Sequence, residues 1–505
     1  MMTIAARDRC AFGRRPALAF FISMVALMVW LFGGQKAAAA GASSATQAGQ
    51  LATGAGNAPD SQVDRLEVRG VGITIDQWAQ TEIWSHIEKK NATHESFLSR
   101  AASDYPSTWT DRSAMSKLTR GLALKLGAGD AVEYTPLPVF VYGPPRHPEN
   151  LMGAAFSVNY ARQEGSLPFD LFVIENAVNG SGPSLAEVFK FFDANPNVPF
   201  ALIFCTDGMV TRKLLEKPGS GLIPDGAAVP AVFNSNVALL VSRPHAIDRL
   251  RPSVVTKPES VDTRETQYDL VKLWNFYWDE TDVFDTHYET DLSARGKRRV
   301  SPHTMSAAWW RSRVPDLLKH TENRGPGEFV PNPWTPVRWT DWQVKQFDES
   351  PVLGYIDRPV SVRLADKNGH ALREKEQASA LRDGWSRLIA QGHEAVVPQR
   401  IFFDTTGDRE WVIPLTQALG AEPDAPSTGN VAEGFDVGYR IGNTGISSGA
   451  VQIALALIAG YQDGKVSAIV DRSDVQAEIV RVTPPSQAQV KQNYETRGDN
   501  PFLYR

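Results

Sequence analysis

A serine in the pattern G-x-S-x-G is the first residue of this sequence that could do chemistry. Ser447 occupies that position within "GNTGISSGAVQIALALIAG", residues 442–460, and an apolar helical pattern follows it. A serine nucleophile of this type needs a carboxylate and then a histidine later in the chain, and no histidine follows His393. We therefore expect a structural role, in which the glycines allow close backbone approach and Ser447 or Ser448 caps the helix.

The thiol of Cys205 is the second candidate nucleophile. The other cysteine, Cys10, lies in a basic N-terminal stretch, so the chain beyond that stretch can form no internal disulfide. Cys205 ends the apolar run "PFALIFC", and Asp207 follows two residues later. A carboxylate this close disfavours the thiolate that a nucleophile needs. We predict that Cys205 is a small residue of the core.

Ionisable side chains are dense along residues 279–291 and raise the question of a metal site. Their oxygens could ligate a divalent cation, but the stretch lacks the glycine of a calcium loop and the H-E-x-x-H pattern. No Walker loop occurs, and no G-x-G-x-x-G opens a helix after a strand. We predict a solvated acidic face, with no metal and no cofactor. The side chains are Asp279, Glu280, Asp282, Asp285, His287, Glu289 and Asp291.

Tryptophan and arginine are concentrated in a polar region at about residues 245–345. These two residue types dominate the energetics of protein interfaces, and "AAWWRSR" and "WTPVRWTDWQ" combine them. The alternative is that the rings, including Trp274 and Trp278, cover a small local core. The candidate partner-binding residues are Trp309, Trp310, Arg311, Trp334, Arg338, Trp339 and Trp342.

The elements that must position these residues alternate between strand and helix. Ser184 and Glu187 predict a capping box for a helix that ends at Asn195-Pro196. This βαβ rhythm predicts an α/β fold with mixed sheets and layered helices. Buried strands are predicted at 66–75, 137–143, 169–176, 199–205 and 236–242.

The alternation returns after residue 352. "VLGYIDRPVSVRLAD" predicts one long strand or a hairpin, "AVQIALALIAGYQDG" a buried helix, and "KVSAIVDRS" with "VQAEIVRVTPP" a closing hairpin. We expect an N-terminal α/β domain at 62–345 that carries the Trp-rich insertion, and a C-terminal α/β domain at 346–485. Residues 486–505 are expected to trail over the surface as a polar tail.

The first 40 residues have the pattern of an export signal. Arginine-rich "RDRCAFGRR" precedes an apolar run, and "QKAAAAGASS" offers a small-residue cleavage site. The apolar run is long enough to remain as an inner-membrane tether through residues 16–34. With either outcome we expect the folded part in the periplasm, after a flexible linker at 41–61. The net charge of −5 predicts no basic surface and no nucleic-acid partner.

Several of these segments are similar to known families. "GNTGISSGAVQIALALIAG" resembles the Gly-Asn-Thr loop and helix of the ketoacyl-synthase branch of the thiolase-like superfamily, and "PFALIFCTDGM" resembles one of its sheet segments. This resemblance implies a thiolase-like arrangement in which Asn443 would be the catalytic loop residue and Cys205 the only candidate for the catalytic cysteine. An acyl-transfer enzyme using Cys205 and Asn443 is therefore the alternative function, although the surroundings of Cys205 favour a non-catalytic version of the fold.

A second resemblance covers most of residues 62–485. "RLEVRGVGITIDQW", "FKFFDANPNVPFALI", "NVALLVSRP" and "SPVLGYIDRPVSVRLAD" resemble the type VI secretion lipase adaptor family. The resemblance implies a periplasmic accessory protein that binds a phospholipase effector and helps to load it onto the spike of a type VI secretion machine. It carries over no catalytic residue, so we expect a binding protein and not an enzyme.

Overall fold

A mixed β-sheet of twelve strands crosses the part of the chain that the computed structural model describes, which is residues 62–502 without 168, 217–225, 257–267, 295–301 and 392–395. All of these residues belong to one compact unit, Ala58–Arg505. The predicted export signal, the tether at 16–34 and the linker at 41–61 lie outside the described residues.

The strands follow the order β10-β9-β11-β12-β7-β1-β6-β5-β3-β4, with β2 paired to β1 and β8 paired to β12. Strands β4, β3 and β5 are mutually parallel, as are β10, β9 and β11, whereas the pairs between these two groups are antiparallel. Their bounds are β1 Arg65–Ile75, β2 Trp78–Ala79, β3 Pro136–Gly143, β4 Leu171–Asn179, β5 Phe200–Asp207, β6 Ser235–Ser242, β7 Gly354–Asp357, β8 Val360–Arg363, β9 Arg400–Phe403, β10 Gly434–Asp436, β11 Ser467–Arg472 and β12 Gln476–Thr483.

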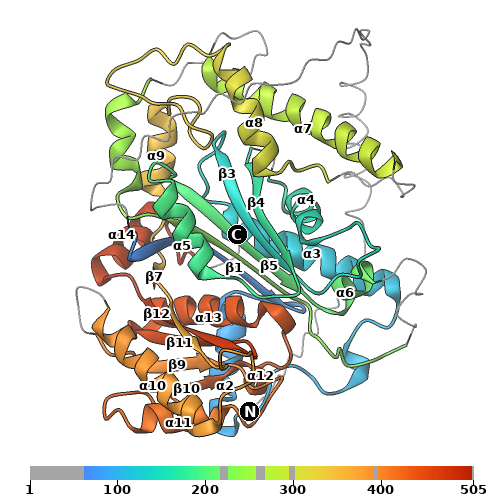
Figure 1. Cartoon of the computed structure of the whole chain (residues 1–505), viewed down its shortest axis with the longest axis vertical. Coiled ribbons are helices and arrows are strands. Elements are labelled where there is room, and N and C mark those ends of the chain that lie inside the picture. The colour runs from blue at the N-terminus through green and yellow to red at the C-terminus, as the bar shows by residue number, and fades with distance from the viewer. Residues whose placement is uncertain are drawn as a thin grey trace, which may run out of the picture. The chain divides into compact units, whose positions relative to one another are not determined.

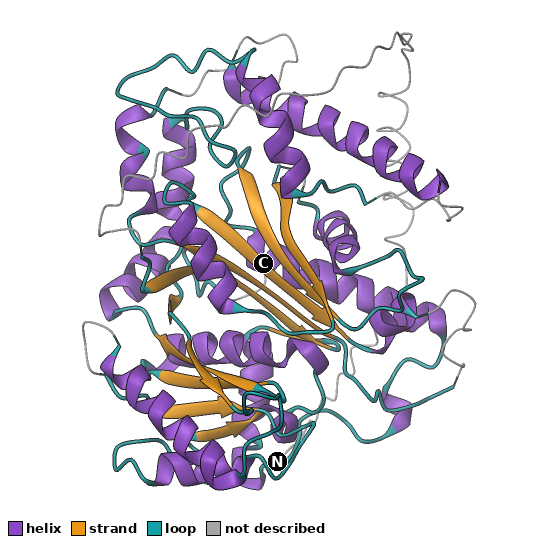
Figure 2. Cartoon of the chain, viewed as in Figure 1, coloured by secondary structure: helices purple, strands orange, loops and turns teal. Residues whose placement is uncertain are grey.

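Helices cover both faces of this sheet, as Figures 1 and 2 show. They are α2 Thr81–Lys89, α3 Trp109–Ala128, α4 Ala154–Gly165, α5 Leu185–Ala194, α6 Met209–Leu215, α7 Asp269–Ala294, α8 Ala307–Leu318, α9 Asp341–Glu349, α10 Glu374–Ala390, α11 Val412–Gly420, α12 Val437–Arg440, α13 Ser448–Asp463 and α14 Gln487–Arg497. The mixed sheet and its layered helices confirm the α/β fold that the sequence predicts.

The apolar helix α13 packs between two groups of strands. One group is β1 and β6, whose far face is covered by α3, and the other is β9, β11 and β12, whose far face is covered by α10 and α11. Residues Ser448 to Gly460 of α13 are all buried. A helix that is apolar on every side belongs inside a protein, and this property places α13 in the central layer.

Strands β5 and β6 are buried along their full length, because helices cover both of their faces. The predicted strands at 66–75, 137–143, 169–176, 199–205 and 236–242 are all present within a few residues, and the predicted closing hairpin is the antiparallel pair β11 and β12.

Local details differ from the predictions at three positions. Ser184 caps α5 by accepting a hydrogen bond from the Glu187 amide, but the Glu187 carboxylate binds Asn176 and does not complete a capping box. Residues 354–363 form neither one strand nor a hairpin: β7 and β8 are separate strands that both pair with β12. Pro359 lies between them and has no amide hydrogen for a sheet.

The end of the chain is the third difference. Residues 487–497 form α14, which begins with a capping box at Ser486. Asn493 donates a hydrogen bond to the Val352 carbonyl, and Phe502 is buried against Tyr461. The prediction that this segment trails over the surface is therefore wrong, because a composition that is polar on average hides the few residues that pack.

The Trp-rich region forms α7, α8 and α9 and covers the edge strand β4. The amide of Ile174 in β4 donates to the carbonyl of Met305, just before α8, and α8 packs on β4. An uncovered edge strand invites pairing with other chains, and this segment blocks it.

Candidate functional site

The Ser447 side chain is fully buried in the turn before α13 and contacts the Cys205 sulfur at 3.6 Å. Neither Ser447 nor Ser448 caps α13 with its side chain, so that prediction is wrong. The Ser448 hydroxyl donates instead to the Asp404 carboxylate. With its hydroxyl enclosed, Ser447 is placed as part of the packing between β5 and α13.

The glycines of the same turn permit the close approach that the sequence predicts. Gly445 has φ +60°, and a Cβ there would lie 2.0 Å from the Asp207 carboxylate. A Cβ on Gly449 would lie 2.4 Å from the Asp471 carboxylate. Side chains at these two positions would therefore force apart the end of β5, the end of β11 and the start of α13.

Asp207 holds the turn to the end of β5. Its fully buried carboxylate accepts hydrogen bonds from the amides of Gly208 and Ile446, at 2.7 and 2.9 Å, and forms two contacts of 2.8 Å with the Arg212 guanidinium. Charge-assisted bonds of this kind are about twice as strong as neutral ones. The loop that resembles the Gly-Asn-Thr loop of ketoacyl synthases is therefore fixed by structural contacts.

Cys205 and Asn443 have separate sets of contacts. Cys205 is fully buried, burial raises the pKa of its thiol well above the usual value, and the Asp207 carboxylate raises this pKa further. The Asn443 amide donates to the Ala231 carbonyl and accepts from the Gly445 amide, each at 2.9 Å. These contacts give no support to acyl transfer by the two residues acting together.

The acidic stretch at 279–291 lies along α7. Two of its carboxylates are buried in ion pairs: Glu280 binds Arg313 at 2.9 Å, and Asp285 binds His303 at 2.6 Å. The prediction of a solvated face therefore fails for these two residues. In the described ranges, no three histidine, cysteine, aspartate or glutamate side chains gather as a metal ion requires.

Three of the candidate partner-binding tryptophans are core residues. Trp310, Trp334 and Trp339 are 0%, 1% and 3% exposed. The Trp310 indole donates to the Pro333 carbonyl at 2.6 Å. Rings enclosed to this degree reach a partner only if the segment unfolds, so we do not propose them as direct contacts.

The remaining candidates are partly accessible but engaged. Trp309 donates its indole N–H to Glu280, and Arg338 donates to the carbonyls of Ser253 and Gly327. Arg338 thus holds a loop together. The Arg311 side chain is 41% exposed and forms an ion pair with a glutamate of β4, Glu175.

Trp342 belongs to an aromatic cluster, defined here as Tyr134, Phe169, Trp274 and Trp342. The Tyr134 ring is central, with centroids 5.4 Å from Phe169, 5.1 Å from Trp274 and 6.1 Å from Trp342. Phe169 is 40% exposed, and the other three rings are half-buried. The cluster joins α7, α9 and the segments that precede β3 and β4.

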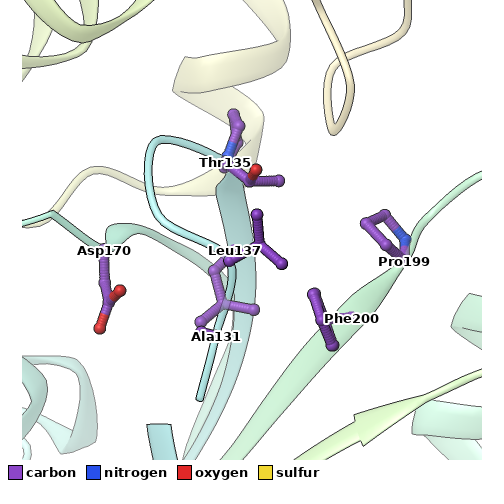
Figure 3. A pocket seen from close by; sticks show the side chains of 8 residues that line it. Ala131, Thr135, Leu137, Asp170, Pro199 and Phe200 are labelled. Atoms are coloured by element: carbon purple, nitrogen blue, oxygen red, sulfur yellow. The ribbon is translucent and has the colours of Figure 1, made fainter. Parts of the chain in front are cut away.

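Thr135 and Asp170, which follow Tyr134 and Phe169 in the chain, line a small hollow that has no room for a water molecule. Figure 3 shows Asp170 on one side of Leu137, with Phe200 on the other. Asp170 is buried, and its Oδ2 has no hydrogen-bond partner. Burial raises the pKa of Asp170 to about 7, and the Glu133 carboxylate adds to this rise.

The sequence pattern indicates Trp342 as a candidate partner-binding residue but does not indicate Tyr134 or Phe169. Tyr134 lies just before one predicted strand and Phe169 begins another, and both are at least 100 residues before α7 and α9 in the chain. Clustering of tryptophan along the sequence is the only signal for such a site. It detects only the residues that are close together in the chain.

Comparison with known proteins identifies two matching family models. The model described as type VI lipase adapter protein Tla3, N-terminal, matches residues 64–225, and the model described as type VI lipase adapter protein Tla3, C-terminal, matches residues 353–484. The region between the two matches contains the Trp-rich helices. Throughout the described ranges, each helix is too short or too polar to cross a membrane.

Solved ketosynthase structures are more distantly similar. A ketosynthase from module 1 of the bacillaene synthase of Bacillus amyloliquefaciens FZB42 aligns with 85% of this chain and 77% of its own, at 10% identity and a TM-score of 0.40. The ishigamide ketosynthase/chain length factor aligns with 83% of this chain and 99% of its own, at 12% identity and a TM-score of 0.41. Similarity of this degree carries no conclusion about residue roles or activity.

Proposed function

The chain belongs to the family of type VI lipase adapter proteins described as Tla3, and from this membership we propose that it binds a phospholipase effector and helps to load it onto the spike of a type VI secretion machine. The single observation that carries the proposal is that the two family models together match most of the sheet. An adapter acts by association, so the relevant site is a surface and not a catalytic cleft.

The proposed effector contact is the aromatic cluster. Aromatic rings that are already packed lose little side-chain entropy on binding, and such rings commonly anchor interfaces. The Phe169 ring is 40% exposed, so a partner side chain could pack against it. A stable complex requires about 1,600 Å² of buried surface, so exposed residues beyond the cluster would complete the contact.

The binding test uses purified protein and a lipase effector from the same genome, with affinity measured by calorimetry. Phe169→Ala and Trp342→Ala should each weaken binding about tenfold or more, because truncation of a central aromatic anchor costs upwards of about 1.4 kcal/mol. Ile413→Ala is a matched control, since Ile413 is 42% exposed on α11.

The possible outcomes distinguish an error in the proposed binding face from an error in the proposed function. If wild-type protein does not bind the lipase, the adapter role is wrong. If wild-type protein binds and both aromatic variants bind equally well, the effector contacts another face. Addition of the spike protein to the preformed complex then tests loading, which requires that a three-component complex elutes together.

We also propose that the protein works in the periplasm, delivered by the segment that precedes the described residues. The support is the charged and apolar pattern of residues 1–40. Cell fractionation, with N-terminal sequencing of the recovered protein, tests this proposal. Recovery in the cytosol would overturn it without affecting the proposed binding to the lipase.

A further inference from the structure

A second hollow lies at the end of β1, away from the aromatic cluster, and is named here the Asp76 hollow. Its cavity volume is about 50 Å³. Residues from five separate segments line it, and most of its wall is apolar, including Met115 of α3, Met209 of α6, Pro230 and Val232. A single water molecule needs roughly 10–15 Å³ of such a cavity, so the hollow has room for a group of about four or five non-hydrogen atoms.

Asp76 contributes a buried carboxyl group to this hollow. Asp76 is 4% exposed. Its Oδ1 accepts a hydrogen bond from the backbone N–H of Asn234 at 3.0 Å, and its Oδ2 has no partner. The Asn234 side chain does not supply the missing donor, because its amide group is bound to Thr119 and Ser116. Buried carboxylate oxygens are normally hydrogen-bonded, and an exception requires an explanation.

The other polar groups around the hollow are directed elsewhere. The Tyr105 hydroxyl donates to the Ser99 carbonyl at 2.6 Å, and the Arg112 guanidinium donates to the carbonyls of Pro106 and Gly226. Burial raises the pKa of Asp76 to about 6, so the group is still mostly ionised at neutral pH. A negative oxygen that lines an apolar hollow is therefore left for a ligand.

We propose that the Asp76 hollow binds a primary ammonium group on a short alkyl stem. The ammonium would donate to Asp76 Oδ2 in a charge-assisted hydrogen bond, and the methylenes would contact the methionine, proline and valine walls. Methionine side chains adapt well to such a stem. This chemistry occurs in free alkylamines and at the end of a lysine side chain, and the proposal does not depend on the adapter function.

The test measures binding of n-butylammonium to the purified protein at pH 7.5 by saturation-transfer NMR. The matched control ligand is 1-butanol, which has the same size and also donates a hydrogen bond but carries no charge. We expect n-butylammonium to bind with a Kd in the low millimolar range and 1-butanol to bind at least about tenfold more weakly. The amine and alcohol series needs no variant, so it is independent of any effect on folding.

Two variants test the residues. Asp76→Asn should reduce the affinity for n-butylammonium at least about tenfold, because the charge is lost. Met209→Trp should block binding by filling the hollow while leaving Asp76 in place. Absence of binding to the wild type, equal binding of 1-butanol, or full binding by a folded Asp76→Asn variant would each overturn the proposal.

N-Acetyl-lysine methylamide distinguishes the two sources of the ligand. Tighter binding of this compound than of n-butylammonium would assign the hollow to a lysine of a protein partner, and weaker binding would assign it to a free amine. Lowering the pH from 7.5 to 5.5 should weaken binding of either compound, since Asp76 becomes protonated. Arg112 and Tyr105 are the other ionisable residues that line the hollow.

Discussion

The Arg481 guanidinium and the Asp357 carboxylate form a buried ion pair in which Nε lies 2.5 Å from Oδ2. The second oxygen of Asp357 binds Arg65 Nε at 2.6 Å. Strand β7 lies between β12 and β1 in the sheet. The Asp357 carboxylate of β7 therefore binds an arginine on each of the two neighbouring strands. The sheet passes at this point from strands matched by the C-terminal family model to β1, which the N-terminal model matches.

Removal of this carboxylate should destabilise the whole sheet. Asp357→Ala leaves the Arg481 side chain, which is 2% exposed, as an unpaired buried charge. Breaking a buried pair in this way costs about 3–5 kcal/mol, and we expect a loss of this size in urea denaturation. The control is Arg65→Ala: the Arg65 side chain is 39% exposed, so its loss should cost less than about 1 kcal/mol. Equal small losses for both variants would contradict a central role for Asp357.

Trp310 should behave as a core residue, although the sequence places it among the partner-binding candidates. Trp310→Ala leaves a cavity behind α8 and should reduce the free energy of unfolding by about 3–5 kcal/mol. Arg311→Glu, at the next position, changes an exposed side chain and should leave stability within about 1 kcal/mol of the wild type. Urea denaturation of the two variants checks this contrast, and a stable Trp310→Ala protein would reopen Trp310 as a partner contact.

Much of the fold can be predicted from local patterns. The runs "PFALIFC" and "NVALLVS" are apolar throughout, so they read as strands with both faces covered, and α13 reads as a buried helix for the same reason. Local patterns do not predict the division of residues 354–363 into two strands. Both β7 and β8 take their register from β12, which lies more than 100 residues later in the chain. Pairing partners of this kind are a property of the folded sheet.

The candidate site was less predictable than the fold. Trp334 and Trp342 have similar sequence surroundings, yet one is buried against Phe191 and the other lies in the aromatic cluster beside Tyr134. Composition records which residues can anchor a partner, but exposure depends on what packs over them. The Asp76 hollow was missed altogether, because its lining comes from five segments and contains no motif.

Stability should fall as the pH rises towards neutrality, and Asp170 should contribute to this change. Burial raises the pKa of Asp170 from about 4 to about 7, so between these values the folded state binds a proton that the unfolded state has released. The contribution of the protonated group is complete below about pH 4 and is lost as the pH rises through about 7. The three-unit shift sets an upper bound of about 4 kcal/mol.

Asp170→Asn tests this effect, because the amide cannot ionise. At pH 8 the variant should be more stable than the wild type, whereas at pH 4.5 the difference should be small or reversed. Urea midpoints across this pH range give the comparison. A wild-type advantage that grows with pH would mean that the Asp170 carboxylate is stabilised in the folded state by a cation.

Cys205 should react with alkylating reagents only when the protein opens. Its sulfur is fully buried, and burial raises the pKa of the thiol, so both access and thiolate formation are suppressed in the folded state. In a Cys10→Ser background, iodoacetamide at pH 7.5 should label Cys205 at least about 1,000-fold more slowly in buffer than in urea. Mass spectrometry of quenched samples measures the two rates. Fast labelling of the folded protein would show a low-pKa, accessible thiol and would favour the acyl-transfer alternative with Asn443; slow labelling that follows the rate of unfolding supports the assignment of Cys205 to the packing between β5 and α13.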